Sequence, residues 1–521
     1  MSMATNTVRV VIDGRIVEAQ GLRRTTTLLD FLREHEHRTG TKEGCAEGDC
    51  GACVVLVGEL DAAGKSVNYV PVNACLQLLP SVDGKSIKTV ESLKAADGSL
   101  HPVQQALVGC HGSQCGFCTP GIVMSLAGLM QTVARPSRGQ VTDALQGNLC
   151  RCTGYRPIVD AALQAADAAQ ARPGSLKMAD EADLDALREI RREATPTYSL
   201  EGDLLVQPVV RTRKGHVFLS PSTVAEVAQA LVDHPGATLL AGSTEVGLKV
   251  NKQHWRPEAI VYLGNVAGLR EVKTSAAAWR IGAAVPLEQV MQLVAAELPD
   301  FAEVLRRFGS PPIRSTATLA GNIANGSPIG DTMPCLMALG ASLTLRHGAK
   351  TRSVPLAQFY TGMKRNLLQP AEFIEAIELP RLNVGPQNAL RHSSPEGSGR
   401  SWERPGVRPA GEIFRAHKIS KRFDQDISAT CAAIRYRLEG GRLKDVRLAF
   451  NGLTPYPARA PRLEALLEGQ RPEDISAAAL DAAVADSFPA RDGLRATWAY
   501  RALVARNLVL RFIGHEEGAL A

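Results

Sequence analysis

Residues 44–53 read GCAEGDCGAC, and a further cysteine, Cys75, follows downstream. The three cysteines of this stretch have the spacing Cys45-x4-Cys50-x2-Cys53. Three ligands in one loop with a distant fourth are typical of the plant-type ferredoxin site, whose [2Fe–2S] cluster needs four thiolates. Structural zinc is the alternative, but zinc ligands usually come as two Cys-x2–4-Cys pairs. The stretch therefore predicts a [2Fe–2S] cluster on Cys45, Cys50, Cys53 and Cys75.

A second group of four cysteines follows, with the spacings Cys115-x2-Cys118 and Cys150-x-Cys152. By spacing alone this group suits zinc as well as iron, because its ligands come in two pairs. Clustered cysteines in a reducing compartment favour metal ligation over disulfides. The remaining cysteines are single and are expected to pack as small buried hydrophobic residues. They are Cys110, Cys335 and Cys431.

The residues around the two groups predict different local folds. The first group lies among strands with one helix, which Thr27 can cap. The second lies among four short helices, and helix N-termini favour an anionic cluster. These helices are predicted to begin near Pro102, Thr119, Thr142 and Pro157.

Downstream of the cysteines, alternating strands and helices predict further α+β domains. A segment rich in Ala, Arg, Asp and Glu reads as a linker, and a later segment low in apolar residues reads as a mobile loop. The whole chain is thus predicted to be multidomain α+β. The predicted ranges are 1–90 and 91–168 for the two cysteine-bearing domains, 169–205 for the linker, 206–385 for a third domain, 386–411 for the mobile loop and 412–521 for a C-terminal domain.

Two loops of the third domain combine glycine with small polar side chains. The loop 239–246 (LLAGSTEV) follows a strand, and its consecutive N–H groups can cradle a pyrophosphate. It is neither G-x-G-x-x-G nor a Walker sequence, so a Rossmann site is not supported. The second loop, 317–331 (ATLAGNIANGSPIGD), ends at Asp331. On composition alone the first loop also reads as an ordinary turn, and Asp331 in the second also reads as a loop cap.

The residues that flank the cysteines make the chain recognisable. The stretches 44–53, 111–121 (HGSQCGFCTPG) and 148–156 (NLCRCTGYR) resemble the two-cluster domain of the molybdenum hydroxylases. That family includes xanthine dehydrogenase, aldehyde oxidase and carbon monoxide dehydrogenase. The resemblance implies a β-grasp plant-type ferredoxin domain followed by a four-helix [2Fe–2S] bundle. It also implies that the second cluster is held by Cys115, Cys118, Cys150 and Cys152, in place of zinc.

The two glycine-containing loops resemble the FAD domain of the same family, which is of the vanillyl-alcohol-oxidase and p-cresol-methylhydroxylase type. By that resemblance the first loop binds the FAD pyrophosphate, and residues of the third and C-terminal domains contact the rest of the cofactor. The run 418–426 resembles the loop near the flavin in xanthine dehydrogenases, where its charges help to admit NAD+; a solvated charge is the alternative for Lys418. The implied FAD contacts are Leu239, Leu240, Ala241, Gly242, Ser243, Thr244, Glu245, Val246, Phe308, Thr318, Gly321, Asn322, Asp331, Ile374 and Lys418.

Iron–sulfur and flavin domains fused without a molybdopterin domain resemble the small subunit of bacterial xanthine dehydrogenases. The resemblance implies that purine is oxidised on a molybdopterin-binding large subunit, with no catalytic residue for hydroxylation on this chain. Electrons then pass through the helical-domain cluster and the ferredoxin-like cluster to FAD and NAD+. An α2β2 heterotetramer is implied. The alternatives are a subunit acting on an aldehyde or N-heterocycle, a free-standing iron–sulfur flavoprotein reductase, and a non-catalytic scaffold, against which the eight clustered cysteines argue.

Composition restricts the other partners. The 521 residues include 59 Lys and Arg and 53 Asp and Glu, with a net charge of +6. So diffuse an excess predicts neither a nucleic-acid nor a membrane partner. The N-terminal residues show no apolar signal core, and no run of about 18 apolar residues occurs. A cytoplasmic location is therefore expected.

Overall fold

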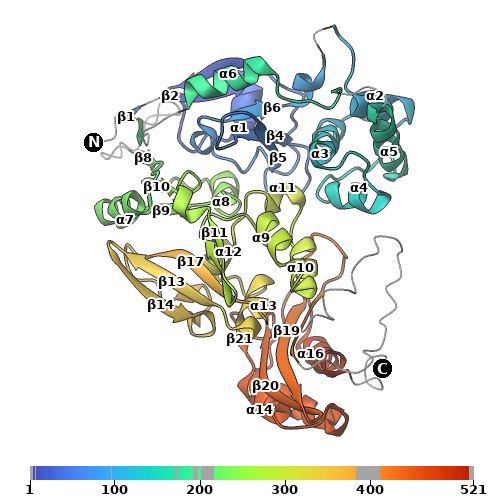
Figure 1. Cartoon of the computed structure of the whole chain (residues 1–521), viewed down its shortest axis with the longest axis vertical. Coiled ribbons are helices and arrows are strands. Elements are labelled where there is room, and N and C mark those ends of the chain that lie inside the picture. The colour runs from blue at the N-terminus through green and yellow to red at the C-terminus, as the bar shows by residue number, and fades with distance from the viewer. Residues whose placement is uncertain are drawn as a thin grey trace. The chain divides into compact units, whose positions relative to one another are not determined.

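The computed structural model describes residues 4–5, 7–95, 97–170, 174–191, 197–200, 216–382 and 411–514 (Figure 1). The chain forms two compact units. Unit 1 comprises Met1–Ala267 with Gly309–Ala317, and unit 2 comprises Gly268–Phe308 with Thr318–Ala521. Each unit is described by itself. Of the predicted mobile loop 386–411, all but the last residue lies outside the described residues.

Unit 1 begins with a five-stranded mixed sheet in which one helix covers a face. The strand order is β3-β2-β6-β4-β5, and only β2 and β6 run parallel. Helix α1 (Leu28–Asp30) continues as a π-helical turn, Phe31–His35, and the predicted cap is confirmed because Thr27 Oγ1 accepts from Asp30 N at 3.1 Å. This is the expected β-grasp arrangement. The strands are β2 (Thr7–Ile12), β3 (Arg15–Gln20), β4 (Val54–Leu60), β5 (Val67–Asn73) and β6 (Ser86–Lys88).

Strand β4 is buried on both faces, and its two faces serve two different cores. Val55 and Val57 pack in the core beneath the first sheet, with Leu28 and Phe31. Val54 and Leu56 instead pack among the helices that follow. Successive side chains of a strand point to opposite faces, so the continuous apolar run VVLV is what such a shared strand requires.

Four helices, visible as a cyan and green group in Figure 1, make up the second part of unit 1, as predicted. The expected start of the third at Thr142 is wrong. Ser137 caps this helix, because its Oγ accepts from Gln140 N at 3.3 Å. The hydroxyl of Thr142 lies within the helix and donates to Arg138 O at 2.9 Å. The helices are α2 (Pro102–Gly109), α3 (Thr119–Thr132), α4 (Arg138–Ala144) and α5 (Arg156–Gln170).

A further helix, α6 (Glu181–Ile190), lies in the range predicted for the linker and is docked on the first sheet. Its Leu187 and Ile190 are buried against Val11 of β2. A buried ion pair adds to this contact: Lys88 Nζ lies 2.7 Å and 2.9 Å from the two carboxylate oxygens of Asp183. Both side chains are at most 5% exposed.

Replacement of Asp183 by Ala is expected to lower the free energy of unfolding by about 3–5 kcal/mol, because it leaves the buried Lys88 ammonium with a single, more distant carboxylate, Asp13 Oδ1 at 3.9 Å. The urea midpoint, followed by circular dichroism, measures the loss. Asp185→Ala on the same helix is the control, since its exposed pair with Arg188 contributes about 0–1 kcal/mol. Equal midpoints for the two variants would contradict the role given to the buried pair.

Unit 1 is completed by a second sheet of order β1-β7-β8-β10-β9, in which β8, β10 and β9 are parallel. The strand predicted before the 239–246 loop is present as β9, and Thr223 caps α7, because its Oγ1 accepts from Glu226 N at 3.2 Å. Phe218, Leu240 and Ile260 join the same core as the β-grasp sheet. The elements are β1 (Ala4–Thr5), β7 (Thr197–Leu200), β8 (His216–Leu219), β9 (Thr238–Leu240), β10 (Ala259–Tyr262), α7 (Val224–Asp233), α8 (Val246–Gln253) and α11 (Pro311–Arg314).

Unit 2 contains an antiparallel sheet of order β11-β12-β17-β13-β14 and a small hairpin, with four helices. The buried helix α13 contacts β17 of this sheet and also contacts the C-terminal sheet. The elements are β11 (Val272–Thr274), β12 (Ala278–Gly282), β13 (Ser342–His347), β14 (Lys350–Pro355), β15 (Tyr360–Gly362), β16 (Arg365–Asn366), β17 (Phe373–Pro380), α9 (Leu287–Val294), α10 (Pro299–Arg306), α12 (Leu319–Asn325) and α13 (Thr332–Leu339).

The C-terminal part of unit 2 is an antiparallel sheet of order β18-β19-β20-β21 with three helices, as the predicted α+β domain requires. In the parts of the chain that the structure describes, no helix has both the length and the apolar character needed to span a bilayer. The elements are β18 (Glu412–Ile419), β19 (Thr430–Glu439), β20 (Arg442–Phe450), β21 (Ala458–Arg459), α14 (Pro461–Leu467), α15 (Ala477–Ser487) and α16 (Trp498–Ile513).

Candidate cluster and flavin sites

The first four predicted ligands form two contacting pairs, Cys45 with Cys50 and Cys53 with Cys75. All four thiols are free, and the second pair is buried. No group of three or more His, Cys, Asp or Glu side chains that could hold a single metal ion occurs among the residues described. Two pairs suit a two-iron cluster, in which two cysteines ligate each iron.

Hydrogen bonds to sulfur favour the thiolate form within each pair. The Cys50 thiol and the N–H groups of Glu47 and Asp49, each 3.4 Å from Cys45 Sγ, lower the pKa of Cys45 to about 4. The Cys75 thiol likewise lowers the pKa of Cys53, while that hydrogen bond and burial raise the pKa of Cys75. Metal ligands must be deprotonated, so loading a cluster here releases protons.

The backbone of the loop passes very close to one of the ligand sulfurs. A Cβ placed on Gly44 would lie 2.8 Å from Cys50 Sγ, closer than ordinary contact allows. Only glycine brings the backbone this near to the ligand. Together with the N–H groups that point at sulfur, this spacing fits an iron–sulfur cluster.

The second four ligands are more exposed. Cys118 lies in contact with Cys150, and both are half-buried, whereas Cys115 and Cys152 are exposed. Burial, and a thiol hydrogen bond to Cys150, raise the pKa of Cys118 to about 12. Burial opposes the thiolate of Cys150 too, but hydrogen bonds led by the Thr153 hydroxyl, 3.2 Å away, outweigh it and lower its pKa. The N-cap of α3 is Cys118 itself, one residue before the predicted Thr119.

A direct hydrogen bond joins the two sets of cysteines. Leu149 N, beside Cys150, donates to the carbonyl oxygen of Cys50 at 2.9 Å. Asn148 adds a contact, because its Nδ2 donates to Gly51 O at 3.3 Å. The path from one ligand cysteine to a ligand of the other set thus consists of covalent bonds and one hydrogen bond.

The three single cysteines differ from one another. Cys335 and Cys431 are fully buried, as expected. The expectation of burial is wrong for Cys110, which is half-buried and whose Sγ lies 2.8 Å from Gln164 Oε1. The Gln164 amide thus gives the Cys110 thiol a polar partner in place of an apolar core.

The first predicted flavin loop, 239–246, lies in unit 1 between β9 and α8. A Cβ on Gly242 would lie 1.8 Å from Thr316 O, so this turn requires glycine. Ser243 has φ +65°, and its buried hydroxyl donates to Leu76 O at 2.5 Å. The Ser243 hydroxyl is therefore already engaged, which leaves backbone N–H groups as the donors for an anion. The first N–H groups of a helix lack intrahelical partners, although Gly247 N here donates to Ser243 O at 2.7 Å. The N–H groups that precede Gly247 are therefore the candidate donors for a phosphate.

Gly242→Ala is expected to lower the FAD affinity about tenfold or more, because overpacking at a site this tight costs about 1–3 kcal/mol. The ratio of acid-released flavin to protein measures the effect. Gly236→Ala is the matched control, since a Cβ there meets nothing within 4 Å. Retention of flavin by the Gly242 variant at the level of the control would contradict the assignment of this loop.

In unit 2, a buried ion pair joins two of the predicted flavin contacts. Lys418 Nζ lies 2.9 Å from Asp331 Oδ2, and both side chains are at most 5% exposed. The other carboxylate oxygen of Asp331 accepts from Ser428 Oγ at 2.6 Å and from Asn451 Nδ2 at 2.9 Å. The solvated-charge alternative for Lys418 is therefore wrong. Asp331 occupies the N-cap position of α13, but its side chain makes no capping bond.

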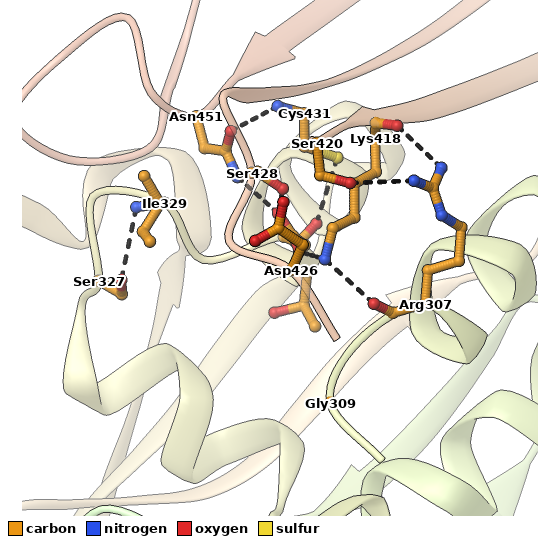
Figure 2. Close-up of polar contacts among 12 residues, drawn as sticks. Arg307, Gly309, Ser327, Ile329, Lys418, Ser420, Asp426, Ser428, Cys431 and Asn451 are labelled. Carbon is orange, nitrogen blue, oxygen red and sulfur yellow. Dashed lines mark hydrogen bonds and ion pairs between the residues drawn. The ribbon is translucent and has the colours of Figure 1, made fainter. Parts of the chain in front are cut away.

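Arg307 holds the segment that carries Lys418. Figure 2 shows its guanidinium directed at this segment, where it donates to Lys418 O at 2.9 Å and to Ser420 Oγ at 3.1 Å. The same group lies 4.6 Å from the ring centroid of Phe423, which is 58% exposed. Lys418 Nζ donates in return to Arg307 O at 3.1 Å.

The other predicted flavin contacts of unit 2 lie on several elements. Thr318 caps α12, and its Oγ1 accepts from Gly321 N at 3.0 Å. Asn322 Oδ1 accepts from Thr332 Oγ1 at 2.6 Å, which ties α12 to the residue after Asp331. Two further contacts complete the set. Ile374 lies buried on β17 opposite Leu345, and Phe308 follows α10.

Three residues that contact the Asp331–Lys418 pair were not predicted from the sequence, namely Arg307, Ser428 and Asn451. Asn451 is fully buried directly after β20, where it also accepts from Cys431 N. The signal available was a polar residue at the end of the apolar run Leu448-Ala449-Phe450. That signal is weak, because turns commonly follow strands and contain Asn.

Comparison with known families assigns the cofactor class. Residues 10–78 match a 2Fe-2S iron-sulfur cluster binding domain, and residues 89–163 match a [2Fe-2S] binding domain. Residues 212–382 match the FAD binding domain in molybdopterin dehydrogenase, and residues 415–515 match the CO dehydrogenase flavoprotein C-terminal domain. The chain thus has the domains of an iron–sulfur flavoprotein, and the match over 89–163 favours [2Fe–2S] over zinc at the second set.

Similarity to longer proteins indicates the family to which these domains belong. The chain is 33% identical to xanthine dehydrogenase of Emericella nidulans over 506 residues, which cover 89% of this chain and 35% of the relative. It is 32% identical to xanthine dehydrogenase of Drosophila pseudoobscura pseudoobscura over 490 residues, covering 85% and 34%. The iron–sulfur, FAD-binding and C-terminal flavoprotein domains of this chain are those of the molybdenum hydroxylase family. The chain spans about a third of the length of these relatives.

A solved structure is similar over part of the chain. It is a chain of carbon monoxide dehydrogenase from Hydrogenophaga pseudoflava, 24% identical, with a TM-score of 0.47. The match covers 56% of this chain and 94% of that one.

Proposed function

We propose that the chain is the electron-transfer part of a xanthine dehydrogenase. It passes electrons from a molybdenum site on a partner subunit, through two [2Fe–2S] clusters, to FAD and then to NAD+. The observation that carries this proposal is the joining, in one chain, of two four-cysteine sets and a flavin-binding domain of the molybdenum hydroxylase family. The substrate, xanthine or hypoxanthine in purine catabolism, is suggested by the relatives named above.

The solvent exposure of the two cysteine sets supports electron flow from the second set to the first. In the second set, Cys115 and Cys152 are exposed, whereas Cys53 and Cys75 of the first set are buried. An electron that arrives from another protein would enter at the exposed set. The chain continues from the buried Cys75 to Leu76, whose carbonyl accepts a hydrogen bond from the Ser243 hydroxyl of the proposed pyrophosphate loop.

The neighbourhood of the second set also fits a protein partner. Phe117 is 47% exposed and Leu149 is 53% exposed, and each neighbours a proposed ligand in the sequence. Apolar side chains beside an electron entry point are suited to a subunit interface. We propose a molybdopterin-binding large subunit as this partner, in an α2β2 heterotetramer located in the cytoplasm.

Each cofactor would be held by residues of this chain, and the bound groups supply the one- and two-electron chemistry. The eight cysteines would hold the clusters. The N–H groups of the 239–246 loop would bind the FAD pyrophosphate. In unit 2, the Asp331 carboxylate would accept hydrogen bonds from FAD hydroxyl groups, and Lys418, 2.9 Å away, would hold that carboxylate in place.

The test is purification of the tagged chain from its native host, followed by assays for iron, FAD and molybdenum and for xanthine-dependent NAD+ reduction. A molybdenum-bearing partner and about four irons per chain are expected, two for each cluster. Activity with an aldehyde or an N-heterocycle instead of xanthine would assign the chain to another molybdenum hydroxylase. NADH oxidation by an artificial acceptor without any molybdenum-bearing partner would indicate a free-standing reductase and overturn the proposal.

A further inference from the structure

Helix α8 connects the proposed pyrophosphate loop to the first set of cysteines. At its start, Ser243 Oγ donates to Leu76 O, and Gly242 O accepts from Gln77 Nε2 at 3.3 Å. At its far end, Asn251 is half-buried and faces the cysteine-bearing loops. Both ends of one short helix therefore contact the segments that hold the proposed cluster.

The carboxamide of Asn251 joins two of those segments. Its Nδ2 donates to Ala46 O at 3.0 Å and to Cys75 O at 2.7 Å. Ala46 follows Cys45 directly, so the two acceptors belong to the two separate stretches of chain that supply ligands. An Asn side chain has two N–H donors on one nitrogen, which is the number that two carbonyls require.

Asn73 also joins the two stretches, since its Nδ2 donates to Gly48 O at 3.1 Å, but it does not connect them to α8. The neighbouring side chain on α8 does not duplicate the contact of Asn251. Lys252 Nζ reaches only the first stretch, at Cys45 O and, 3.8 Å away, at Glu47. Lys252 is also exposed, and an exposed charge contributes little once water competes for it. Asn251 alone, among the described residues of α8, has recorded hydrogen bonds to both stretches.

We propose that Asn251 is a positioning residue for the first cluster, which fixes the Cys45 and Cys75 stretches against α8 and thereby sets the environment of that cluster. The proposal rests on the proposed function, because it assumes a cluster at this site. The residue touches neither sulfur nor iron; it acts through the two carbonyls. Hydrogen bonds and charge around a cluster set its reduction potential, and outer residues orient the ligands.

Two substitutions distinguish the hydrogen bonds of the Asn251 side chain from its volume. Asn251→Ala removes the donors that fix both stretches to the far end of α8, while Asn73 Nδ2, which donates to Gly48 O at 3.1 Å, still joins the stretches to each other. The looser attachment is expected to broaden the electron paramagnetic resonance signal of the first cluster. Asn251→Asp keeps the shape but replaces the donors by a carboxylate that faces two carbonyl oxygens. The added negative charge disfavours reduction, so the Asp variant is expected to lower the midpoint potential of the first cluster below that of the wild type.

The measurement is a redox titration of the purified holoprotein, followed by electron paramagnetic resonance, with iron and FAD content and the thermal midpoint recorded for each variant. Gln253→Ala is the matched control, since Gln253 is an exposed amide residue on the same helix. The signal of the second cluster is an internal control, and it is expected to stay unchanged in every variant.

The outcomes distinguish this inference from the proposed function. A wild-type protein without two cluster signals would overturn the proposed function. Two signals in the wild type, with both Asn251 variants identical to the Gln253 control in potential and line shape, would overturn only the inference. Equal shifts of both clusters would also overturn it, because they would indicate a general change of fold.

Discussion

Replacement of Asp331 by alanine is expected to remove most of the flavin from the purified protein and to destabilise unit 2. The Lys418 ammonium would remain buried, with Arg307 O as its recorded acceptor. Removing one member of a buried pair costs about 3–5 kcal/mol. The hydroxyl of Ser428 and the amide of Asn451 would lose their acceptor as well. Flavin content and the urea midpoint measure the two effects separately.

The double variant Asp331→Ala with Lys418→Met separates the effect of the ion pair on protein stability from its effect on flavin binding. Removal of both charges eliminates the unpaired ammonium, so the urea midpoint is expected to recover toward that of the wild type. Flavin binding is not expected to recover, because both proposed contacts are gone. A double variant that binds FAD normally would show that the pair only supports the fold.

Replacement of Cys150 by serine is expected to abolish one of the two cluster signals and to lower the iron content from about four to about two per chain, because serine does not supply the thiolate that an iron–sulfur cluster needs. Xanthine-dependent NAD+ reduction should stop. NADH oxidation by an artificial acceptor should survive, since FAD and the other cluster remain. Iron analysis, electron paramagnetic resonance and the two assays measure these effects.

The control for this variant is Cys110→Ser, the same change in the same domain at a thiol that contacts Gln164. It is expected to keep both signals. Loss of NADH oxidation in the Cys150 variant while FAD stays bound would contradict the proposed order, in which flavin is the carrier next to NAD+.

Local sequence signals predicted those parts of the fold that depend on neighbouring residues. Thr27 caps its helix as expected, because the cap bond spans only three residues. Thr142 failed as a start because Ser137, five residues earlier, forms a capping box with Gln140. Both hydroxyl residues precede helix-forming sequence, so the choice between them depended on a reciprocal side-chain bond that the pattern alone did not rank.

The remaining features depend on contacts between distant residues. Asp183 and Lys88 are 95 positions apart, and each alone reads as a solvated charge. Asn451 and Asp331 are 120 positions apart. Burial of such groups becomes visible only when the fold brings their partners together, because an unpaired buried charge is too costly to persist. The cysteine spacings were informative for the opposite reason: ligands in one loop lie close together in any fold.

The shared strand β4 has a consequence for whether these domains can be separated. Val54 and Leu56 belong to the helical core, while Val55 and Val57 belong to the core of the sheet. A gene fragment that encoded the first domain alone would leave two large aliphatic side chains uncovered on a strand, a surface prone to aggregation. A chimera that carried the ferredoxin-like module of a one-cluster protein in this place would therefore also need apolar residues at positions 54 and 56 of the strand. The two cysteine-bearing domains thus depend on each other to bury β4, although each carries its own set of four cysteines.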